Sequence, residues 1–281
     1  MKKNEKIKGH GFSKFILILI IIFAGTYYYA RYIETRGLVV REYSVINKKI
    51  PESFHGFKIV QFSDTHYGMT TFSDELKNMV NKINTLKPDI VVFTGDLIDY
   101  HYDLKDEEKN DIINILSDIN SSLGIYAVVG NHDQNTSYES ILSGSNINLL
   151  KNKYEYIYNG TSEKIMLIGL DDYLEGTLDL DTAFNYEDDT SYKILLSHEP
   201  DVYDKLPKTP DLMLAGHSHN GQVRIPLAGA IYKTVGAKKY YDPEYSLGDT
   251  KMYISGGVGT SKYKVRLFDK PSISLYRLYS K

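Results

Sequence analysis

Residues 126–133 have the sequence YAVVGNHD, in which an apolar, β-branched run ends in a glycine, an amide, an imidazole and a carboxylate. The run 126–129 predicts a buried strand. Two hypotheses explain the polar residues that follow it. Asn131 and Asp133 favour turns for backbone reasons, or the segment forms a metal or catalytic site at the carboxyl end of a strand, where open α/β sheets place their chemistry. Recurrence of the pattern elsewhere in the chain would favour the second hypothesis.

The pattern does recur after four other apolar runs. Those runs end in SDTH at 63–66, GDLID at 95–99, SHEP at 197–200 and GHSH at 216–219. Five of the eight histidines of the chain lie at these strand ends, namely His66, His132, His198, His217 and His219. Each residue taken singly is explained as a helix cap, a turn former or a structural histidine. Those separate explanations give no reason for five strands to share one feature, so the pattern predicts a common polar site.

The residue types at these ends indicate metal binding. Asp64 and His66 are two residues apart, as are His217 and His219, so each pair points to one side of an extended backbone. Carboxylate oxygen and imidazole nitrogen without sulfur suit Mn²⁺, Fe and Zn²⁺. The candidate ligands are Asp64, His66, Asp96, Asn131, His198, His217 and His219.

The size of this ligand set predicts more than one ion. A single catalytic ion takes roughly three protein ligands and keeps one position open. The larger set therefore predicts two divalent ions (Mn, Zn or Fe), about 3.5–4 Å apart and bridged by a carboxylate. Asp96 follows the middle strand of the first three and is the natural bridge.

The order of the predicted elements gives the fold class. Strands are predicted at 57–62, 90–93 and 126–129, with helices at 71–86 and around 112–119 between them. Ser73 is the predicted N-cap of the first helix. This alternation indicates βαβ units with parallel pairing, and therefore an α/β fold. The second half is β-rich, with strands predicted at 164–169, 193–197, 211–215, 222–225, 252–255, 265–268 and 273–278, and a further strand is predicted at 38–45.

The N-terminal segment differs from the rest of the chain. Residues 1–14 form a basic tail, and residues 15–30 form an apolar run that ends in tyrosines. As a helix the run would be about 24 Å long, slightly short of a hydrocarbon core of ~30 Å. No good small-residue cleavage site follows it, so a membrane anchor or uncleaved signal is favoured over a cleaved secretory signal.

The charges on either side of this run predict its orientation. Five lysines precede it, against Arg31, Arg36 and Arg41 after it. This small excess predicts a single-pass protein with a cytoplasmic N-terminus and its main domain outside the cell membrane. The predicted organisation is a tail at 1–14, an anchor at 15–30, a juxtamembrane connector at 31–56 and one globular domain at 57–281.

The composition argues against several classes of protein. A net charge of −3 gives no support for nucleic-acid binding, which usually needs a strongly basic surface. The chain has no cysteine, which excludes thiolate metal sites, disulfides and cysteine nucleophiles. Composition leaves the oligomeric state undetermined.

The ordered motifs D-x-H at 64–66, G-D-x-x-D at 95–99, G-N-H-D at 130–133, S-H at 197–198 and G-H-x-H at 216–219 resemble the calcineurin-like metallophosphoesterase superfamily. The resemblance covers residues 58–268. The stretches SHEPDVYD at 197–204 and GHSHNGQVRIP at 216–226 are similar to a bacterial, membrane-targeted branch. That branch includes phosphodiesterases of the UDP-2,3-diacylglucosamine pyrophosphatase type.

The resemblance implies a four-layer sandwich of two mixed β-sheets flanked by helices, with a dinuclear centre above the strand ends. It implies that Asp64, His66, Asp96 and His219 hold one ion. It implies that Asp96, Asn131, His198 and His217 hold the other. His132 matches the non-ligand catalytic histidine of the family, and Asp99 matches the acid that orients it.

The sequence departs from the patterns of related families in three places near the site. Asn220 stands where this branch usually has glycine, which puts the fit of the substrate in doubt rather than metal binding. Asp133 stands where the Ser/Thr protein phosphatases of the superfamily have glutamate, and Tyr100-His101 stands where they have Arg-Gly. A protein phosphatase is therefore disfavoured.

The expected activity is metal-dependent hydrolysis of a phosphodiester or pyrophosphate bond by metal-activated hydroxide. The expected substrate is a phosphoester of the cell envelope, including one linked to a lipid. Protonated His132 is expected to assist the leaving oxygen. The alternatives are a phosphomonoesterase acting on small soluble substrates, and a non-catalytic envelope module that binds phosphates. The second alternative ranks last, because such relics usually lose ligands and this set is complete.

Overall fold

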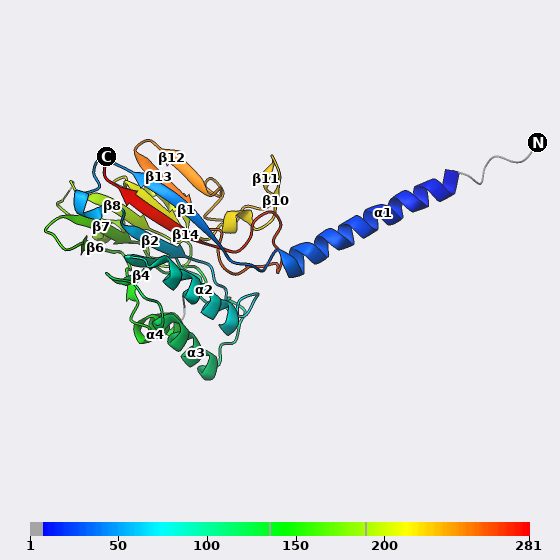
Figure 1. Ribbon diagram of the computed structural model, residues 1–281, viewed down its shortest axis with the longest axis horizontal. Helices are drawn as coiled ribbons and strands as arrows, with labels where there is room; N and C mark the ends of the chain where they lie inside the picture. Colours follow the sequence, from blue (N-terminus) through cyan, green and yellow to red (C-terminus); the bar gives the residue numbers. More distant parts are fainter. Residues whose placement is uncertain (1–7, 135, 189) are drawn as a thin grey trace, which may run out of the picture.

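The computed structural model describes residues 8–134, 136–188 and 190–281, so the first half of the basic tail lies outside the described residues. Two six-stranded sheets form the folded part of the chain (Figure 1). The first has the order β1 (Val39–Ile46), β14 (Ser272–Tyr279), β2 (Lys58–Phe62), β3 (Ile90–Phe93), β4 (Ile125–Ala127) and β5 (Asn148–Leu149). The second has the order β12 (Glu244–Leu247), β13 (Thr250–Ile254), β9 (Leu212–Ala215), β8 (Tyr192–Leu196), β7 (Lys164–Gly169) and β6 (Lys153–Tyr158).

Both sheets mix parallel and antiparallel pairs. β2, β3 and β4 pair in parallel, whereas β14 runs antiparallel to β2. In the second sheet β7, β8 and β9 are parallel, and β6 is antiparallel to β7. Parallel neighbours end at the same edge of a sheet, so the loops that follow them are brought together there.

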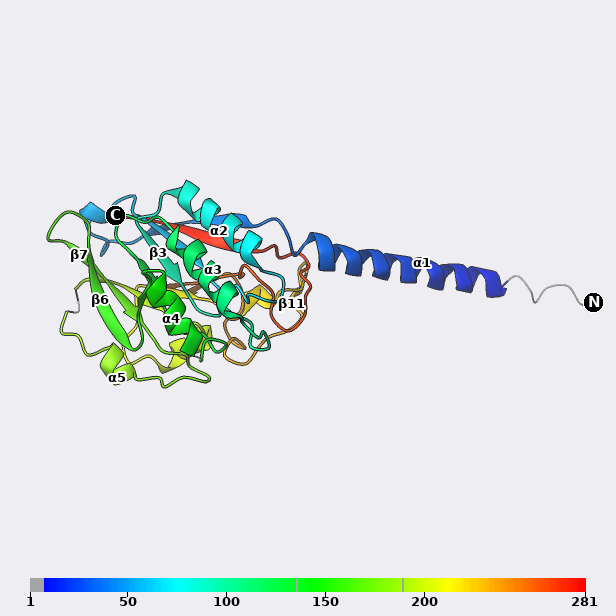
Figure 2. The same cartoon turned by 90° about the horizontal axis from the view of Figure 1, so that it is seen from below.

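Helices cover the outer face of the first sheet: α2 (Ser73–Leu86), α3 (Asp106–Ser117) and α4 (Thr136–Gly144) (Figure 2). The buried residues of α2 recur every three or four positions, which gives the helix one apolar stripe. That stripe, Leu76, Met79, Val80 and Ile83, packs against the outer side chains of β2 and β3.

The space between the two sheets forms a second apolar core. Side chains of alternating strand positions meet there, among them Ile59, Ile90, Val92, Ile194 and Leu212. The outer face of the second sheet is covered by α5 (Leu180–Ala183), by the 3-10 helix Pro200–Lys205 and by loops. Strands buried on both faces explain the continuous apolar runs in the sequence. The predicted α/β fold of two mixed sheets flanked by helices is confirmed.

Several predicted elements differ from the structure. Phe72, not Ser73, precedes the first turn of α2, and its backbone N–H donates to the Glu75 carboxylate at 3.0 Å. The predicted strand 265–268 is wrong: it contributes only an isolated bridge between Val223 and Leu267. The strand predicted at 222–225 shrinks to β10 (Arg224–Ile225), which forms a separate hairpin with β11 (Gly229–Ala230).

The first strand lies inside the segment predicted as a connector. β1 pairs in parallel with β14 along its whole length, from Val39 opposite Ser272 to Ile46 opposite Tyr279. The segment is therefore part of the first sheet rather than a free linker. We propose that the folded domain begins near Val39 instead of residue 57.

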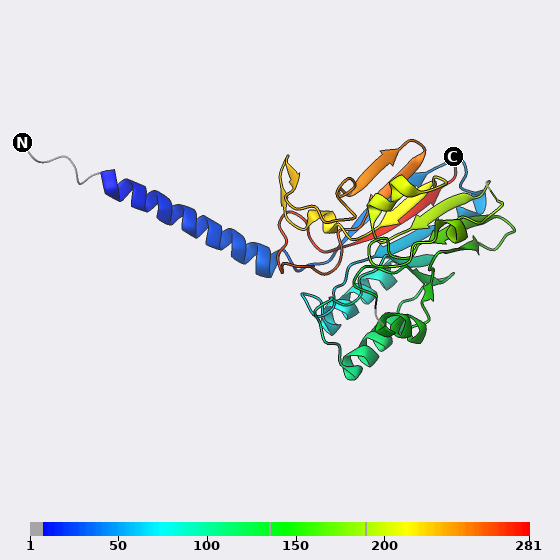
Figure 3. The ribbon, with the colours of Figure 1, turned by 180° about the vertical axis from the view of Figure 1, so that it is seen from behind.

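One long helix projects from the end of the folded domain (Figures 1 and 3). It comprises α1 (Lys8–Tyr28) and a π-helical turn, Tyr29–Ile33. The stretch Gly11–Ile33 is 23 residues long, and by length and composition it is apolar enough to cross a membrane. Its most apolar 18-residue window is not buried, whereas Ala30 near its end is buried against the domain.

Candidate metal centre

The five polar strand ends converge at one place between the two sheets. β2, β3 and β4 are neighbours in the first sheet, and β8 and β9 are neighbours in the second. The loops after these strands carry all of the predicted ligands. Asp64, His66, Asp96, His198, His217 and His219 are buried, and Asn131 is half-buried.

The ligand loops have an unusual backbone. The φ angles of five predicted ligands lie in the left-handed region: Asp64 (52°), His66 (42°), Asp96 (61°), His217 (65°) and His219 (48°). Such a conformation costs a non-glycine residue of order 1–3 kcal/mol and persists only where the surroundings hold it. Five such residues in these loops indicate that the surrounding structure holds the backbone so that these side chains point into the site.

Among the described residues, three groups of donor atoms lie close enough together to hold an ion: the first two contain predicted ligands alone, and the third contains His66, Asp99 and His132. In the first, His219 Nε2 lies 3.4 Å from Asp64 Oδ1 and 3.0 Å from His66 Nε2. In the second, His198 Nε2 lies 3.2 Å from Asp96 Oδ2 and 3.2 Å from His217 Nδ1. Metal–nitrogen bonds of 2.0–2.1 Å place neighbouring ligands roughly 3.0–3.4 Å apart, so each group has the dimensions of a coordination shell.

Asp96 lies between the first two groups. Its Oδ2 atom is 3.5 Å from His66 Nε2 in the first group and 3.2 Å from His198 Nε2 in the second. Its other oxygen, Oδ1, accepts the backbone N–H of His132 at 2.9 Å. One carboxylate oxygen therefore faces both groups while the other is held by the protein.

Asn131 provides an independent test of whether the residues fit a metal. Its Oδ1 atom is buried and has no hydrogen-bond partner among the described residues. Leaving a buried polar atom unsatisfied costs about 1–3 kcal/mol, and an amide oxygen is a metal ligand as well as a hydrogen-bond acceptor. The unsatisfied oxygen, on a cavity wall that Asp96 and His217 also line, therefore fits a cation.

Outer hydrogen bonds set which ring nitrogen of two histidines is free. His198 Nδ1 lies 2.6 Å from the carbonyl oxygen of Thr94, and His217 Nε2 lies 2.6 Å from that of Val235. A carbonyl can only accept, so each of these nitrogens carries the proton and the other nitrogen has a free lone pair. Those free nitrogens are the ones that face each other in the second group, as metal ligation requires.

The electrostatics of the buried site also favour cations. Burial lowers the pKa of His66 to about 3 and that of His217 to about 4, so both rings are neutral near pH 7, the form that binds metal. Burial, with the Asp96 carboxylate nearby, raises the pKa of Asp64 to about 7. Burial would lower the pKa of His198, but the Asp96 carboxylate outweighs it and raises that pKa. The buried Asp96 carboxylate thus attracts positive charge, which a divalent ion would supply in place of a proton on His198.

His132 and Asp99 lie beside the first group but are not tightly paired. Asp99 Oδ2 is 3.9 Å from His132 Nδ1, beyond hydrogen-bond length, and 3.6 Å from His66 Nδ1. The backbone N–H of Tyr100 donates to His132 Nδ1 at 2.9 Å. A backbone amide therefore orients this ring in the structure, whereas the family resemblance implies that Asp99 does so.

Asp133 is a site residue with a role that the sequence does not predict. Its buried carboxylate accepts the backbone N–H groups of Asp96 at 2.7 Å, Leu97 at 2.9 Å and Gly130 at 2.9 Å. It thereby ties the loop after β3 to the loop after β4. Its position in G-N-H-D was a signal, but nothing in the sequence reveals which backbone groups it binds.

Replacing Asp133 by asparagine is expected to loosen the centre. The amide has one acceptor oxygen and brings N–H groups toward backbone N–H donors, so unfolding free energy should fall by about 1–3 kcal/mol. Metal affinity should fall by roughly 10- to 100-fold, as for other outer-shell contacts. Thermal melting and metal titration measure both effects. The exposed Asp249→Asn control should change neither, and an unchanged Asp133→Asn protein would contradict the tethering role.

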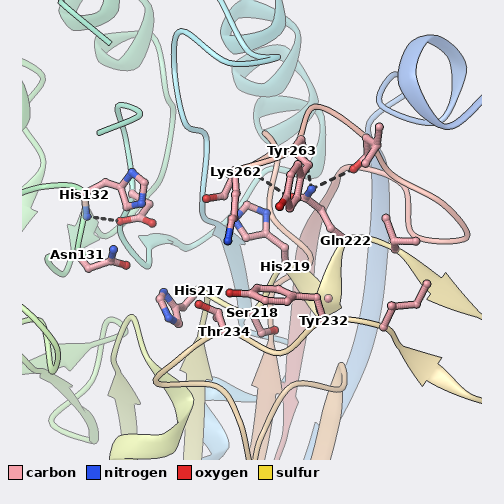
Figure 4. Close-up of a pocket in the computed structure, with 16 residues that line it drawn as sticks. Asn131, His132, His217, Ser218, His219, Gln222, Tyr232, Thr234, Lys262 and Tyr263 are labelled. Atoms are coloured by element: carbon pink, nitrogen blue, oxygen red, sulfur yellow. Dashed lines mark hydrogen bonds between the residues drawn. The ribbon is translucent and has the colours of Figure 1, made fainter. Parts of the chain in front are cut away.

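The candidate metal centre opens into a cavity of about 350 Å³. Asn131, His132, His217 and His219 line it on the side of the centre, and Figure 4 shows Tyr232, Lys262 and Tyr263 on other parts of its wall. The wall therefore combines metal-binding groups with aromatic rings and one lysine. It is large enough for a phosphoester and part of its organic substituent.

Comparison with known proteins places these features in context. A family model described as "Calcineurin-like phosphoesterase" matches residues 57–245. The chain is 34% identical to the uncharacterized metallophosphoesterase YkuE of Bacillus subtilis over 261 residues, covering 91% of both chains. It is 27% identical to the UDP-2,3-diacylglucosamine pyrophosphatase LpxG of Chlamydia muridarum, covering 90% of this chain and 92% of the relative. It is 28% identical to the phosphodiesterase YaeI of Escherichia coli, covering 79% and 82%.

Proposed function

The chain belongs to the calcineurin-like phosphoesterase family, and on that premise we propose that it hydrolyses a phosphodiester or pyrophosphate bond at a centre of two divalent ions. The observation that carries the proposal is the position of Asp96, whose Oδ2 atom lies between two groups of metal-binding side chains. The phosphodiesterase and pyrophosphatase among the relatives support the class of bond.

We assign four ligands to each ion. Asp64, His66, Asp96 and His219 would hold one, and Asp96, Asn131, His198 and His217 would hold the other. When bound, divalent ions at such a centre acidify a water molecule and offset the charge of the phosphoryl group. Mn²⁺, Zn²⁺ and Fe all suit this set of oxygen and nitrogen donors.

The role of His132 is to stabilise the leaving oxygen. Because its Nδ1 atom accepts the Tyr100 N–H, a neutral ring carries its proton on Nε2 and can donate it in a hydrogen bond. Asp99 Oδ2 lies 3.9 Å from His132 Nδ1, so its carboxylate adds negative charge beside the ring. In this setting His132 is the general acid that transfers a proton to the departing group.

The bond class can be tested with two chromogenic substrates. The metal-loaded protein is expected to turn over bis(4-nitrophenyl) phosphate with a kcat/KM at least roughly tenfold above that for 4-nitrophenyl phosphate, a preference of about 1.4 kcal/mol. Initial rates with Mn²⁺ and with Zn²⁺ measure it. The reverse preference would indicate a phosphomonoesterase, and no turnover of either substrate with full metal loading would indicate a binding module.

We further propose that the apolar helix anchors the protein in the cell membrane, with the N-terminus in the cytoplasm and the domain outside. The length and composition of Gly11–Ile33 support the span, and the excess of lysine before it supports the orientation. A domain held at a membrane meets phosphoesters of the envelope, including those linked to lipids. The relation to a pyrophosphatase that acts on a diacylated sugar nucleotide supports this class of substrate.

A further inference from the structure

Exposed apolar side chains gather around the mouth of the cavity and on the adjoining hairpin. We call six of them the apolar rim: Ile225, Leu227, Ile231, Tyr232, Tyr263 and Phe268. Ile231, Tyr232 and Tyr263 line the cavity of the metal centre, and Ile225, Leu227 and Phe268 line a neighbouring hollow beside the β10–β11 hairpin. Scattered exposed apolar residues are normal, but a gathered set at a functional opening indicates a binding surface.

The apolar rim lies at the end of the domain from which α1 leaves. Two perpendicular views show the β10–β11 hairpin at that end (Figures 1 and 2). A hydrogen bond connects the rim segment to the end of the apolar helix. The backbone N–H of Arg266, between Tyr263 and Phe268, donates to the carbonyl oxygen of Ala30 at 2.9 Å. A bilayer crossed by Gly11–Ile33 would therefore have its surface beside the rim.

The chemistry of the rim matches a membrane–water interface. Leu227 is fully exposed at the hairpin turn, where its apolar side chain contributes no burial energy to the fold. Lys262 Nζ lies 5.3 Å from the centre of the Tyr232 ring and 5.6 Å from that of Tyr263. Tyrosines concentrate at the interface of a bilayer, and lysines are attracted to its anionic headgroups.

We infer that the apolar rim is a second membrane contact, which seats the mouth of the metal-centre cavity on the leaflet that α1 enters. The continuity of the rim with the end of the apolar helix favours a bilayer over a protein partner. One consequence of this contact rests on the proposed function. A phosphoester with a lipid tail would reach the metal centre from the bilayer without crossing water. The contact itself does not depend on catalysis.

The cysteine-free chain allows a direct test on the full-length protein. Leu227→Cys places a single label on the rim. Ile46→Cys is the matched control, because Ile46 is 63% exposed and pairs with Tyr279 at the end of the domain remote from α1. Each variant carries an environment-sensitive nitrobenzoxadiazole label and is reconstituted in vesicles of phosphatidylcholine and phosphatidylglycerol.

The label at 227 is expected to be quenched by doxyl-labelled lipids and shielded from iodide, and the label at 46 is expected to behave in the opposite way. Iodide quenching at 227 equal to that at 46 would overturn the membrane contact. Shielding from iodide without quenching by the lipids would also overturn it, in favour of a protein partner or a second copy of this chain. None of these readouts requires turnover, so their failure is distinct from failure of the proposed function.

A charge variant connects the contact to catalysis. Leu227→Glu is expected to lower turnover of a phosphoester embedded in vesicles several-fold while leaving turnover of bis(4-nitrophenyl) phosphate unchanged, and Ile46→Glu should change neither. Equal loss on both substrates would show damage to the fold instead of a lost contact. Unchanged turnover of the embedded substrate would show that the rim does not deliver it.

Discussion

Asp96→Asn is expected to release both metal ions and to lower turnover by about 10³-fold or more, because charge stabilisation by the metals contributes several kcal/mol. The reason is geometric. Oδ2 of Asp96 is 3.5 Å from His66 Nε2 and 3.2 Å from His198 Nε2, so one atom serves both groups. An asparagine can keep the bond to the His132 N–H through its oxygen. It then presents an N–H₂ group, which binds no metal, to both coordination shells.

Metal content measures this prediction. Protein dialysed against a defined concentration of Mn²⁺ or Zn²⁺ and analysed for bound metal should hold two ions in the unchanged chain and fewer than one in Asp96→Asn. Asp249→Asn, on the exposed turn between β12 and β13, is the control and should keep both ions. Loss of only one ion from Asp96→Asn would contradict the bridging role. Retention of both would refute the assignment of Asp96 as a ligand.

His132→Ala is expected to slow turnover by about 10²–10⁴-fold, the usual contribution of general acid catalysis. It should leave the metal content unchanged, since we assign the ions to the two donor groups that lack His132 and not to the third group, in which its ring lies with His66 and Asp99. Its side chain lines the cavity, and only its backbone N–H bonds to Asp96. The two groups of ligands therefore remain intact when the ring is removed.

The measurement compares kcat with bound metal for the same preparation. His101→Ala is a matched control, because His101 is an exposed histidine on the neighbouring loop and is not expected to affect either quantity. A substrate with a better leaving group should lose less from the mutation, since it needs less stabilisation of the departing oxygen. Loss of metal from His132→Ala would make this residue a ligand and contradict its proposed role.

The sequence predicts those site residues that directly follow an apolar strand. Asp64, Asp96 and His198 each follow an apolar run, and strands buried on both faces show such runs clearly. The carboxyl ends of neighbouring parallel strands lie at one edge of a sheet, so the sequence alone predicts that these distant motifs lie together.

The parts that the sequence did not predict depend on backbone groups from distant segments. The three N–H groups that Asp133 accepts come from two loops, and the N–H that orients His132 belongs to Tyr100. Backbone amides have no sequence signature. The place of β1 at the sheet edge was hidden for a similar reason, because its partner β14 lies at the other end of the chain.

The wrong strand at 265–268 has a specific physical cause. Its apolar residues predicted a strand, but the Arg266 side chain is fully buried and donates to the carbonyl oxygens of Gly256, Gly257 and Gly259. Its backbone N–H bonds to Ala30 instead of a neighbouring strand. The residues around an arginine do not reveal whether it is buried in a loop or exposed on a strand. Tertiary contacts therefore decided the structure of this segment.

Anomalous X-ray diffraction from crystals grown with Mn²⁺ tests the central claim most directly. Two peaks about 3.5–4 Å apart, one on each side of Asp96 Oδ2, are the predicted result. One should lie within bonding distance of Asp64 and the other within bonding distance of the Asn131 oxygen. A single peak, or peaks that leave Asp96 out of both coordination shells, would contradict the account.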